Sequence, residues 1–228
     1  MSVRSVSEWR KLLKLSYGQH GITIKGIKAD VTELEIPEMI GNQQVVAIDA
    51  YAFRQCASLV KISLPDSVRE IGCSAFWGCT NLTTVEFQNE KADIAYDAFR
   101  NCPGLADENG FVVFKDVLYG YYGSDVHIKI PEKVHEISPI AFFGCHSNSA
   151  QSVVIPETVK SISAFTFSSC KDLEYVYIPG SVTRIDETTF RGCTKLSIAA
   201  PSGSVAEEFA RVNRIPFVEM PHGTTVIR

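Results

Sequence analysis

The sequence predicts an α/β-type repeat solenoid, in which similar coils of chain stack on one another. The first observation is that six of the seven cysteines recur at spacings of 23, 23, 43, 25 and 23 residues. The second is that each of these six follows a phenylalanine by three positions. A period of about 20 to 50 residues is typical of solenoids, because each unit buries its apolar face against the next. The six cysteines are Cys56, Cys79, Cys102, Cys145, Cys170 and Cys193.

Composition and charge exclude several classes of protein. At 228 residues, the chain is long enough to bury about 70 to 75% of the surface that its unfolded form exposes, so neither a metal nor a disulfide is needed for stability. Its net charge of −4 lacks the basic footprint of a general nucleic-acid binder. No apolar run approaches the roughly 18 residues of a membrane helix. We therefore expect a folded protein with no nucleic-acid partner and no membrane insertion.

Residues 1–13 lack the continuous apolar core of a secretory signal, because charged residues interrupt the segment every few positions. The sequence as written therefore predicts a cytoplasmic protein. A chain from which a leader had been removed would instead be secreted or at the cell surface, and the sequence leaves both locations open.

The first part of the chain, residues 1–30, is expected to form an N-terminal cap. Trp9, Leu12 and Leu13 have helical spacing, and the isoleucines within residues 22–27 indicate a strand after this helix. The apolar face at the end of a solenoid needs such a cover. A helix that binds a membrane surface or a partner is the alternative, and its short length disfavours it.

One coil is represented by residues 60–64, where apolar and polar residues alternate. This period of two predicts a short strand with Ile62 and Leu64 inward and Lys61 outward. Pro65 ends the strand because proline lacks the amide donor for a further ladder bond. The chain then turns and buries further side chains, which are Val68, Ile71, Phe76 and Cys79.

These positions combine into the motif L-x-x-I-x-I-P-x-x-V-x-x-I-x-x-x-A-F-x-x-C, which recurs in six phased copies over residues 31–200. The motif resembles the leucine-rich repeat of BspA-like bacterial proteins. The resemblance implies a right-handed leucine-rich-repeat coil with a parallel β-sheet on its concave face, whose strands stack in register. The first copy is looser, and its extra residues around Gly41 and Asn42 are expected to form a loop insertion.

The interval of 43 residues between the third and fourth of the six cysteines predicts a remodelled coil. Within residues 109–123, two β-rich runs flank Lys115 and Asp116 and predict an inserted β-hairpin. BspA-like proteins commonly carry a similar aromatic hairpin. The insert is either purely structural or a binding ledge. The tyrosines of such a ledge would be Tyr119, Tyr121 and Tyr122.

The last part of the chain, residues 201–228, is expected to be a capping helix followed by a tail. Ser204 and Glu207 form the Ser-x-x-Glu pattern of a capping box. Phe209 and Val212 lie three positions apart, which predicts one apolar helical face. This face would close the last coil.

The periodic cysteines are interpreted as a buried column of structural thiols, because free cysteine is among the most buried residue types. A disulfide ladder or a metal site is the alternative, but no Cys-x-x-Cys pair accompanies the column and the histidines lack zinc-binding spacing. Neither a phosphate-binding loop nor a nucleophile elbow is present. We therefore expect no cofactor and no metal. Cys73 lies outside the period and is expected to be exposed, so a thiol enzyme using it is a remote alternative.

The predicted strand surface carries the candidate binding residues. Tyr175 and Tyr177 occupy consecutive outward positions, where polar residues are the norm, and tyrosine is enriched among interface residues that dominate binding. The two tyrosines are therefore the leading candidates for partner contact. The alternative is that they only stack on side chains of neighbouring strands. The other candidates on this face are Val154, Lys129, His127, Glu86 and Lys61.

The sequence thus predicts a non-enzymatic module for protein–protein or protein–glycan interaction. Some BspA-like proteins are surface adhesins that contact extracellular-matrix proteins, so the resemblance implies a bacterial surface adhesin if the chain is exported. An intracellular scaffold or regulatory repeat module is the alternative. The identity of the partner stays open. A monomer or weak oligomer is expected, since an exposed sheet edge at an imperfect cap is able to pair.

Overall fold

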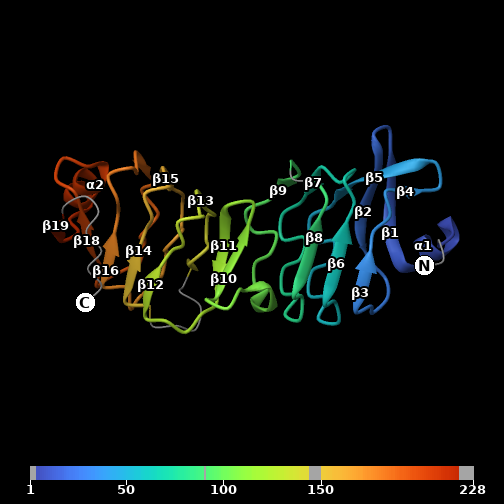
Figure 1. Cartoon of the computed structure of the whole chain (residues 1–228), viewed down its shortest axis with the longest axis horizontal. Coiled ribbons are helices and arrows are strands. Elements are labelled where there is room, and N and C mark those ends of the chain that lie inside the picture. Colours follow the sequence, from blue (N-terminus) through green and yellow to red (C-terminus); the bar gives the residue numbers. More distant parts are fainter. Residues whose placement is uncertain (1–3, 90, 144–149, 221–228) are drawn as a thin grey trace. The chain divides into compact units, whose positions relative to one another are not determined.

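The computed structural model describes residues 4–89, 91–143 and 150–220. The chain divides into two compact units, Met1–Ala106 (unit 1) and Asp107–Arg228 (unit 2). Both units are built mainly of short strands joined by turns, as a β-solenoid requires, and contain little helix (Figure 1). The boundary between the units falls inside the predicted repeat region rather than at its ends.

Unit 1 begins with a short helix and continues as strands. Its elements are α1 (Val6–Leu12), β1 (Leu13–Gly18), β2 (Gly21–Ile27), β3 (Glu33–Glu35), β4 (Met39–Ile40), β5 (Gln43–Ile48), β6 (Lys61–Leu64), β7 (Glu70–Ile71), β8 (Thr84–Phe87), β9 (Asp93–Ile94) and the 3-10 helix η1 (Pro103–Leu105).

Two sheets of unit 1 run along the stack of coils. One has the strand order β3-β6-β8, all parallel, and aligns Leu34, Ile62 and Val85 across its strands. The other has the order β1-β2-β5-β7-β9, in which β2, β5, β7 and β9 are parallel. Each repeat therefore contributes one strand to each sheet, and the predicted stacking in register is confirmed within this unit.

The N-terminal segment contains the predicted helix and an additional strand. Ser5 caps α1 through a reciprocal capping box with Glu8, and Trp9 is buried. The helix ends early because Leu13 starts β1, which pairs antiparallel with β2. The sequence pattern did not indicate the strand β1. The expected loop insertion at Gly41 is also more regular than predicted, since β4 and β5 pair as a hairpin around Gly41 and Asn42.

Among its described residues, unit 2 contains the remaining strands and one α-helix. Its elements are β10 (Phe111–Phe114), β11 (Val117–Tyr121), β12 (His127–Lys129), β13 (Glu136–Ile137), β14 (Ser152–Val154), β15 (Ser161–Ile162), β16 (Tyr175–Tyr177), β17 (Arg184–Ile185), β18 (Ser197–Ala200), α2 (Val205–Asn213) and β19 (Phe217–Glu219).

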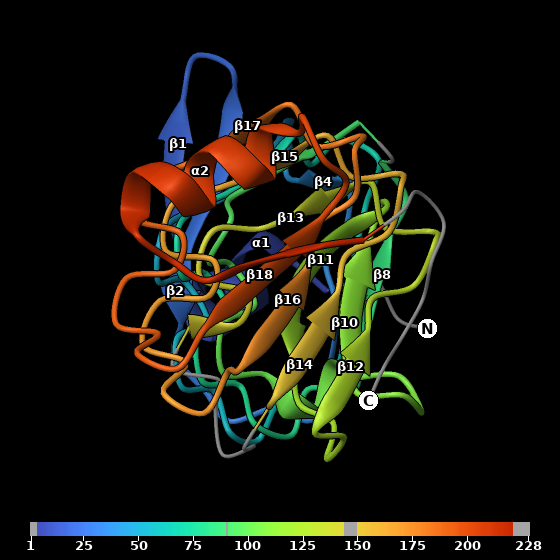
Figure 2. The same cartoon turned by 90° about the vertical axis from the view of Figure 1, so that its left-hand side faces the viewer.

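The largest sheet of unit 2 has the parallel order β12-β14-β16-β18-β19. Figure 2 shows β12, β14, β16 and β18 as successive arrows that lie side by side. The strand β19 is an unpredicted addition from the C-terminal segment. Residues 221–228 of the predicted tail lie outside the described residues.

The predicted hairpin is confirmed as β10 and β11, which pair antiparallel. Lys115 and Asp116 form its turn with φ values of 50° and 63°, and two positive φ values are the geometry that matches the twist of a two-residue hairpin. The strand β11 also pairs in parallel with β13. The insert therefore supplies a strand to the stack of coils in unit 2.

The predicted C-terminal helix is confirmed as α2, with Ser204 accepting a hydrogen bond from the Glu207 amide. The Glu207 carboxylate accepts from the amide of Gly203 rather than from that of Ser204, so the capping box is incomplete. Ala206 and Ala210 lie in the core. Val212, predicted to face inward, is 63% exposed.

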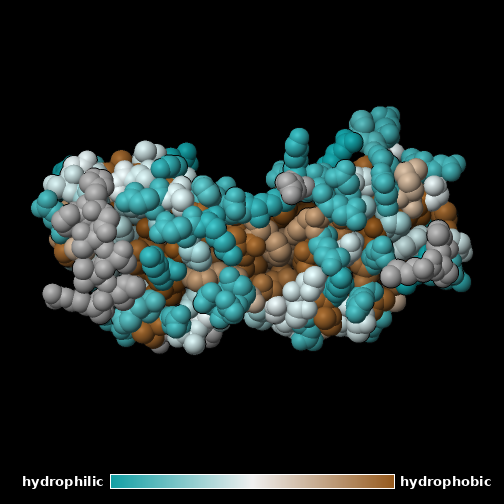
Figure 3. Space-filling view, viewed as in Figure 1, coloured by the Kyte–Doolittle hydropathy of each residue, from teal (hydrophilic) through white to brown (hydrophobic). Residues whose placement is uncertain are grey.

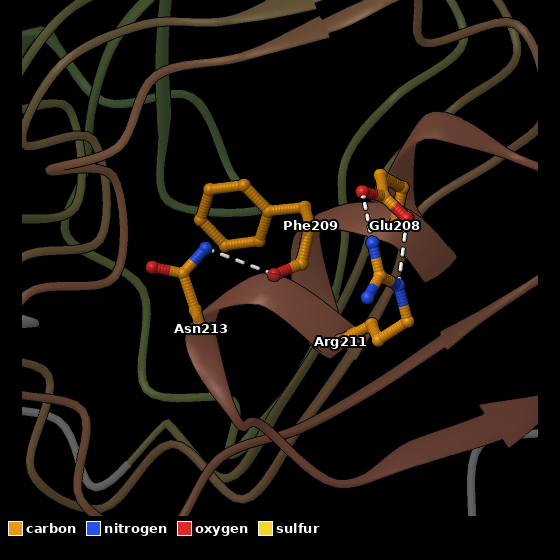
Figure 4. A network of polar contacts seen from close by, with 4 residues as sticks. All are labelled: Glu208, Phe209, Arg211 and Asn213. Atoms are coloured by element: carbon orange, nitrogen blue, oxygen red, sulfur yellow. Dashed lines mark hydrogen bonds and ion pairs between the residues drawn. The ribbon is translucent and has the colours of Figure 1, made fainter.

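Two further contacts hold the exposed side of α2 (Figure 4). The Arg211 guanidinium donates to both carboxylate oxygens of Glu208, and the Asn213 side chain donates to the carbonyl oxygen of Phe209.

The phenylalanines that precede the periodic cysteines form stacked columns in the core. In unit 1, the Phe53 and Phe76 rings lie 5.1 Å apart between centroids, and the Phe99 ring follows at 5.3 Å. In unit 2, the Phe142, Phe167 and Phe190 rings stack at 4.9 and 5.4 Å. Such aromatic pairs contribute about 0.5 to 1.5 kcal/mol each beyond the area that they bury.

The cysteine column is mainly a ladder of buried thiols that donate across coils. The Cys79 thiol donates to the carbonyl oxygen of Phe53 at 2.9 Å, and the Cys102 thiol donates to that of Phe76 at 3.0 Å. Cys193 repeats the contact on Phe167. These three, with Cys56, are free thiols. The prediction of buried structural thiols is thus confirmed for Cys79 and Cys102, whereas Cys56 and Cys193 are free but only partly buried.

One member of the column departs from this pattern. Cys170 is buried and its Sγ lies 3.0 Å from the carbonyl oxygen of Phe142, but it is disulfide-bonded. The thiol interpretation is therefore wrong for Cys170, where the disulfide alternative holds. Cys145 lies outside the described residues.

Candidate interaction surface

Outward-facing residues of one set of parallel strands form a strand face on each unit. We define it as the outward residues of β3, β6 and β8 in unit 1 and of β12, β14, β16 and β18 in unit 2. All seven predicted partner-binding residues lie on these strands. The parallel pairings align the outward residues of successive coils.

The strand face of unit 1 is polar and charged. The Lys61 ammonium lies 2.5 Å from the Glu86 carboxylate. Their mutual hydrogen bond raises the pKa of Lys61 and lowers that of Glu86. Both side chains are solvent-exposed, so the pair adds little to stability. Glu33 and Glu35 lie on the adjacent strand β3 and add negative charge around Lys61.

The strand face of unit 2 has two aligned columns. The first column aligns His127, Ser152, Tyr175 and Ser197. The second column aligns Lys129, Val154, Tyr177 and Ala199. A hydrogen bond of 2.9 Å joins His127 Nδ1 and Ser152 Oγ. The two tyrosines are thus in register with Ser152 and Val154 of the preceding coil.

Several of these residues pack together into what we call the outer cluster. Val154, Tyr177 and Ala199 are its buried members, with Tyr175 and Met220 packed partly buried against them. It is separate from the main core of unit 2. Figure 3 shows apolar side chains among polar ones over β12 and β14.

Burial divides the predicted contact residues of unit 2. Tyr177 is only 7% exposed and Val154 is also buried, so these two side chains stack across strands and offer little surface. Tyr175 is half-buried, and burial raises the pKa of its phenol. Lys129 is exposed. Of the two tyrosines, Tyr175 is thus the one that keeps substantial accessible area.

The hairpin tyrosines do not form one ledge. Tyr121 is buried, with its ring 4.9 Å from that of Phe111 and 5.9 Å from that of Phe142 between centroids. It therefore extends the phenylalanine column of unit 2, as the structural interpretation of the insert requires. Tyr119 and Tyr122 are half-buried.

A group that the sequence analysis missed lies in the turns of unit 1. Arg54 stacks on the rings of Tyr51 and Trp77, and we call these three residues the turn cluster. Arg54 and Trp77 each follow a periodic phenylalanine directly, so the repeat period itself was the signal that could have placed them side by side. Cys73 lies nearby in the sequence and is an exposed free thiol, as predicted.

The described residues show neither a metal-binding cluster nor a membrane-spanning helix. The described residues hold no group of three or more His, Cys, Asp or Glu side chains placed to bind a metal ion. No helix among them has the length and apolar character needed to cross a bilayer.

Comparison with known proteins decides the family. The model of the BspA type leucine rich repeat region matches residues 28–109 and 118–227 in six copies. The chain belongs to this family. Repeat proteins of the BspA type typically act as protein-interaction modules. The family expected from the repeat motif is thereby confirmed.

Two solved structures have the leucine-rich-repeat fold of this BspA-type chain. A leucine-rich repeat protein of T. pallidum is similar, with 27% identity and a TM-score of 0.55 over 94% of this chain and 98% of that one. One from Bacteroides ovatus has 21% identity and a TM-score of 0.56, over 83% of this chain and 54% of that one. A search of curated proteins finds no match.

Proposed function

We propose that this BspA-type repeat protein is a non-enzymatic protein-interaction module whose strand face in unit 2, around Tyr175, contacts the partner. The observation that carries the proposal is the outer cluster. The strand face of unit 1 presents glutamate, lysine, serine and threonine. At the corresponding positions, unit 2 carries tyrosine, valine and alanine beside histidine, lysine and serine. The tyrosines, valine and alanine pack together on the side of the sheet away from the main core.

The arrangement around Tyr175 fits the anatomy of a contact site. Protein interfaces have an apolar centre inside a polar rim, and tyrosine is enriched among the residues that dominate binding. The buried Val154 and Tyr177 support the Tyr175 ring, while His127 and Lys129 lie at the polar margin. A side chain held by packed neighbours loses little conformational freedom on binding, which favours affinity.

The finer points of fold and setting are part of the proposal. We infer that α1 and α2 cover the apolar ends of the coils, supported by the burial of Trp9, Ala206 and Ala210. The resemblance to BspA-like adhesins favours a surface role, and a protein partner is preferred to a glycan because the outer cluster is apolar. An intracellular scaffold is the second setting, which fractionation of the native cells would distinguish from a surface location.

The test uses the full chain and a matched tyrosine variant. Wild type, Tyr175→Ser and Tyr96→Ser are immobilised in equal amounts and exposed to an extract of the native cells, and retained proteins are quantified by mass spectrometry. Tyr96 is exposed in unit 1 and is not on the strand face. We expect a partner whose retention falls by about tenfold or more in Tyr175→Ser and stays unchanged in Tyr96→Ser.

Two outcomes would count against the proposal. If every retained protein binds wild type and Tyr175→Ser equally, the strand face of unit 2 is not the contact site. If the chain turns over a substrate and iodoacetamide stops the reaction through Cys73, the module is a thiol enzyme instead.

A further inference from the structure

The turn cluster of unit 1 places a guanidinium between two aromatic rings. The Arg54 Cζ atom lies 4.6 Å from the ring centroid of Trp77 and 5.7 Å from that of Tyr51. Tyr51 is 56% exposed, and Arg54 is exposed as well. Contact with two rings fixes the plane of a side chain that is otherwise flexible.

The backbone beneath the cluster is held by bonds between coils. The amide of Tyr51 donates to the carbonyl of Cys73 at 3.0 Å, and the amide of Gln55 donates to that of Trp77 at 2.7 Å. Tyr51 has a φ of 60°, a conformation that is unfavourable for a bulky residue and persists only where the surroundings enforce it. The two turns are therefore a firm base for the turn cluster.

The coil does not require these residue types. Ser74 and Asp97 occupy the position of Tyr51 in the two following coils. Their polar side chains bond to each other, with the Ser74 hydroxyl donating to the Asp97 carboxylate at 2.5 Å. The same position holds Ile140 and Phe165 in later coils. It therefore accepts short polar as well as large apolar residues, and the coil does not itself require the exposed ring of Tyr51.

The charge of the cluster is uncompensated. Within the described part of the chain, no carboxylate forms a salt bridge with the Arg54 guanidinium, whereas nearby Lys25 is paired with Asp49 at 2.7 Å. The guanidinium is a planar fork of donors that matches a carboxylate in two parallel hydrogen bonds. A carboxylate from another molecule would complete it.

We propose that the turn cluster is a second contact surface, separate from the strand face, for a protein segment that presents an aspartate or glutamate beside an apolar side chain. Arg54 takes the carboxylate and the exposed ring of Tyr51 takes the apolar neighbour. Tryptophan, tyrosine and arginine are the three residue types most enriched at the energetic centres of protein interfaces. The positive charge selects an acidic partner, since electrostatic complementarity sets specificity.

The experiment selects peptides against the full chain. A phage-displayed library of random peptides of about 12 residues is selected on immobilised wild type, and the selected peptides are synthesised and titrated against four proteins. These are wild type, Arg54→Gln, Tyr51→Ser and the control Arg69→Gln, in which an exposed arginine of unit 1 without an aromatic partner loses its charge. Circular dichroism verifies that each variant is folded.

We expect selected peptides that contain aspartate or glutamate and bind Arg54→Gln and Tyr51→Ser about tenfold or more weakly than wild type, with no change for Arg69→Gln. Replacing the acidic residue of the peptide by its amide should produce a similar loss. The proposal is overturned if selection gives no acidic peptide, or if binding is insensitive to Arg54 or to the peptide carboxylate. A strand-face variant such as Tyr175→Ser should leave this binding unchanged, so the test stands apart from the proposed function.

Discussion

The ring of Phe209 in α2 lies edge-on to the ring of Phe190, with centroids 6.0 Å apart and an angle of 65° between the planes. Phe209 thereby meets the last ring of the stacked column in unit 2. Because Phe209 is half-buried, Phe209→Ala should reduce the free energy of unfolding by about 1 to 3 kcal/mol, less than a fully buried phenylalanine would cost. Urea denaturation followed by circular dichroism measures this loss.

The matched control for Phe209 is Val212→Ala on the same helix. Val212 is well exposed, so its truncation should change stability by less than about 0.5 kcal/mol. Equal effects of the two substitutions would contradict a capping role for the Phe209 ring.

Tyr121 is expected to be structural rather than a contact residue. Its ring lies between those of Phe111 and Phe142, and its hydroxyl oxygen accepts a hydrogen bond from the Asp125 amide. Tyr121→Ala should therefore destabilise the chain by about 3 kcal/mol, in the range for buried aromatic residues. Tyr119→Ala, on the same strand but half-buried, should cost clearly less. Thermal and urea unfolding measure both losses. If Tyr121→Ala proved less destabilising than Tyr119→Ala, the structural role of Tyr121 would be contradicted.

The repeat pattern predicted the coils well because each inward position is observed several times. The alternation of apolar and polar residues in 60–64 recurs at the strands of both units. A single atypical residue therefore does not alter the prediction of a strand. The strand β1 was missed because Leu13 fits both the helical spacing after Trp9 and the alternation Leu13-Lys14-Leu15. The short strand β19 forms through pairing with β18, a long-range contact that no local pattern encodes.

Only part of the candidate surface could be predicted from the repeat pattern. The strand register places Tyr177 beside Val154. The burial of Tyr177, however, depends on Ala199 and Met220, which lie further along the chain. The turn cluster was missed because Tyr51 and Arg54 lie in turns, outside any strand pattern. Only alignment by the repeat period brings Arg54 next to Trp77.

Tyr175 and Tyr177 should differ in their effects on stability. Tyr177 is buried in the outer cluster, so Tyr177→Ser should lower the free energy of unfolding by about 2 to 4 kcal/mol. Tyr175 is half-buried, and Tyr175→Ser should cost about 1 kcal/mol. Urea titrations of both variants test this order. If Tyr177→Ser proved as stable as wild type, the outer cluster would not pack as described.

The thiol ladder should make stability fall at alkaline pH. The pKa of Cys79 is raised from 9.0 to about 12, chiefly by its contact with Cys102, and burial raises that of Cys193 to about 11. Between pH 9 and 11 the unfolded chain therefore loses thiol protons that the folded chain keeps, so the stabilisation is complete below pH 9 and declines above it. We expect a loss of about 1 to 3 kcal/mol between pH 8 and 10.5, measured by urea midpoints under reducing conditions. Cys79→Ala should show a shallower decline than wild type, and parallel curves for the two proteins would rule out the ladder as the cause.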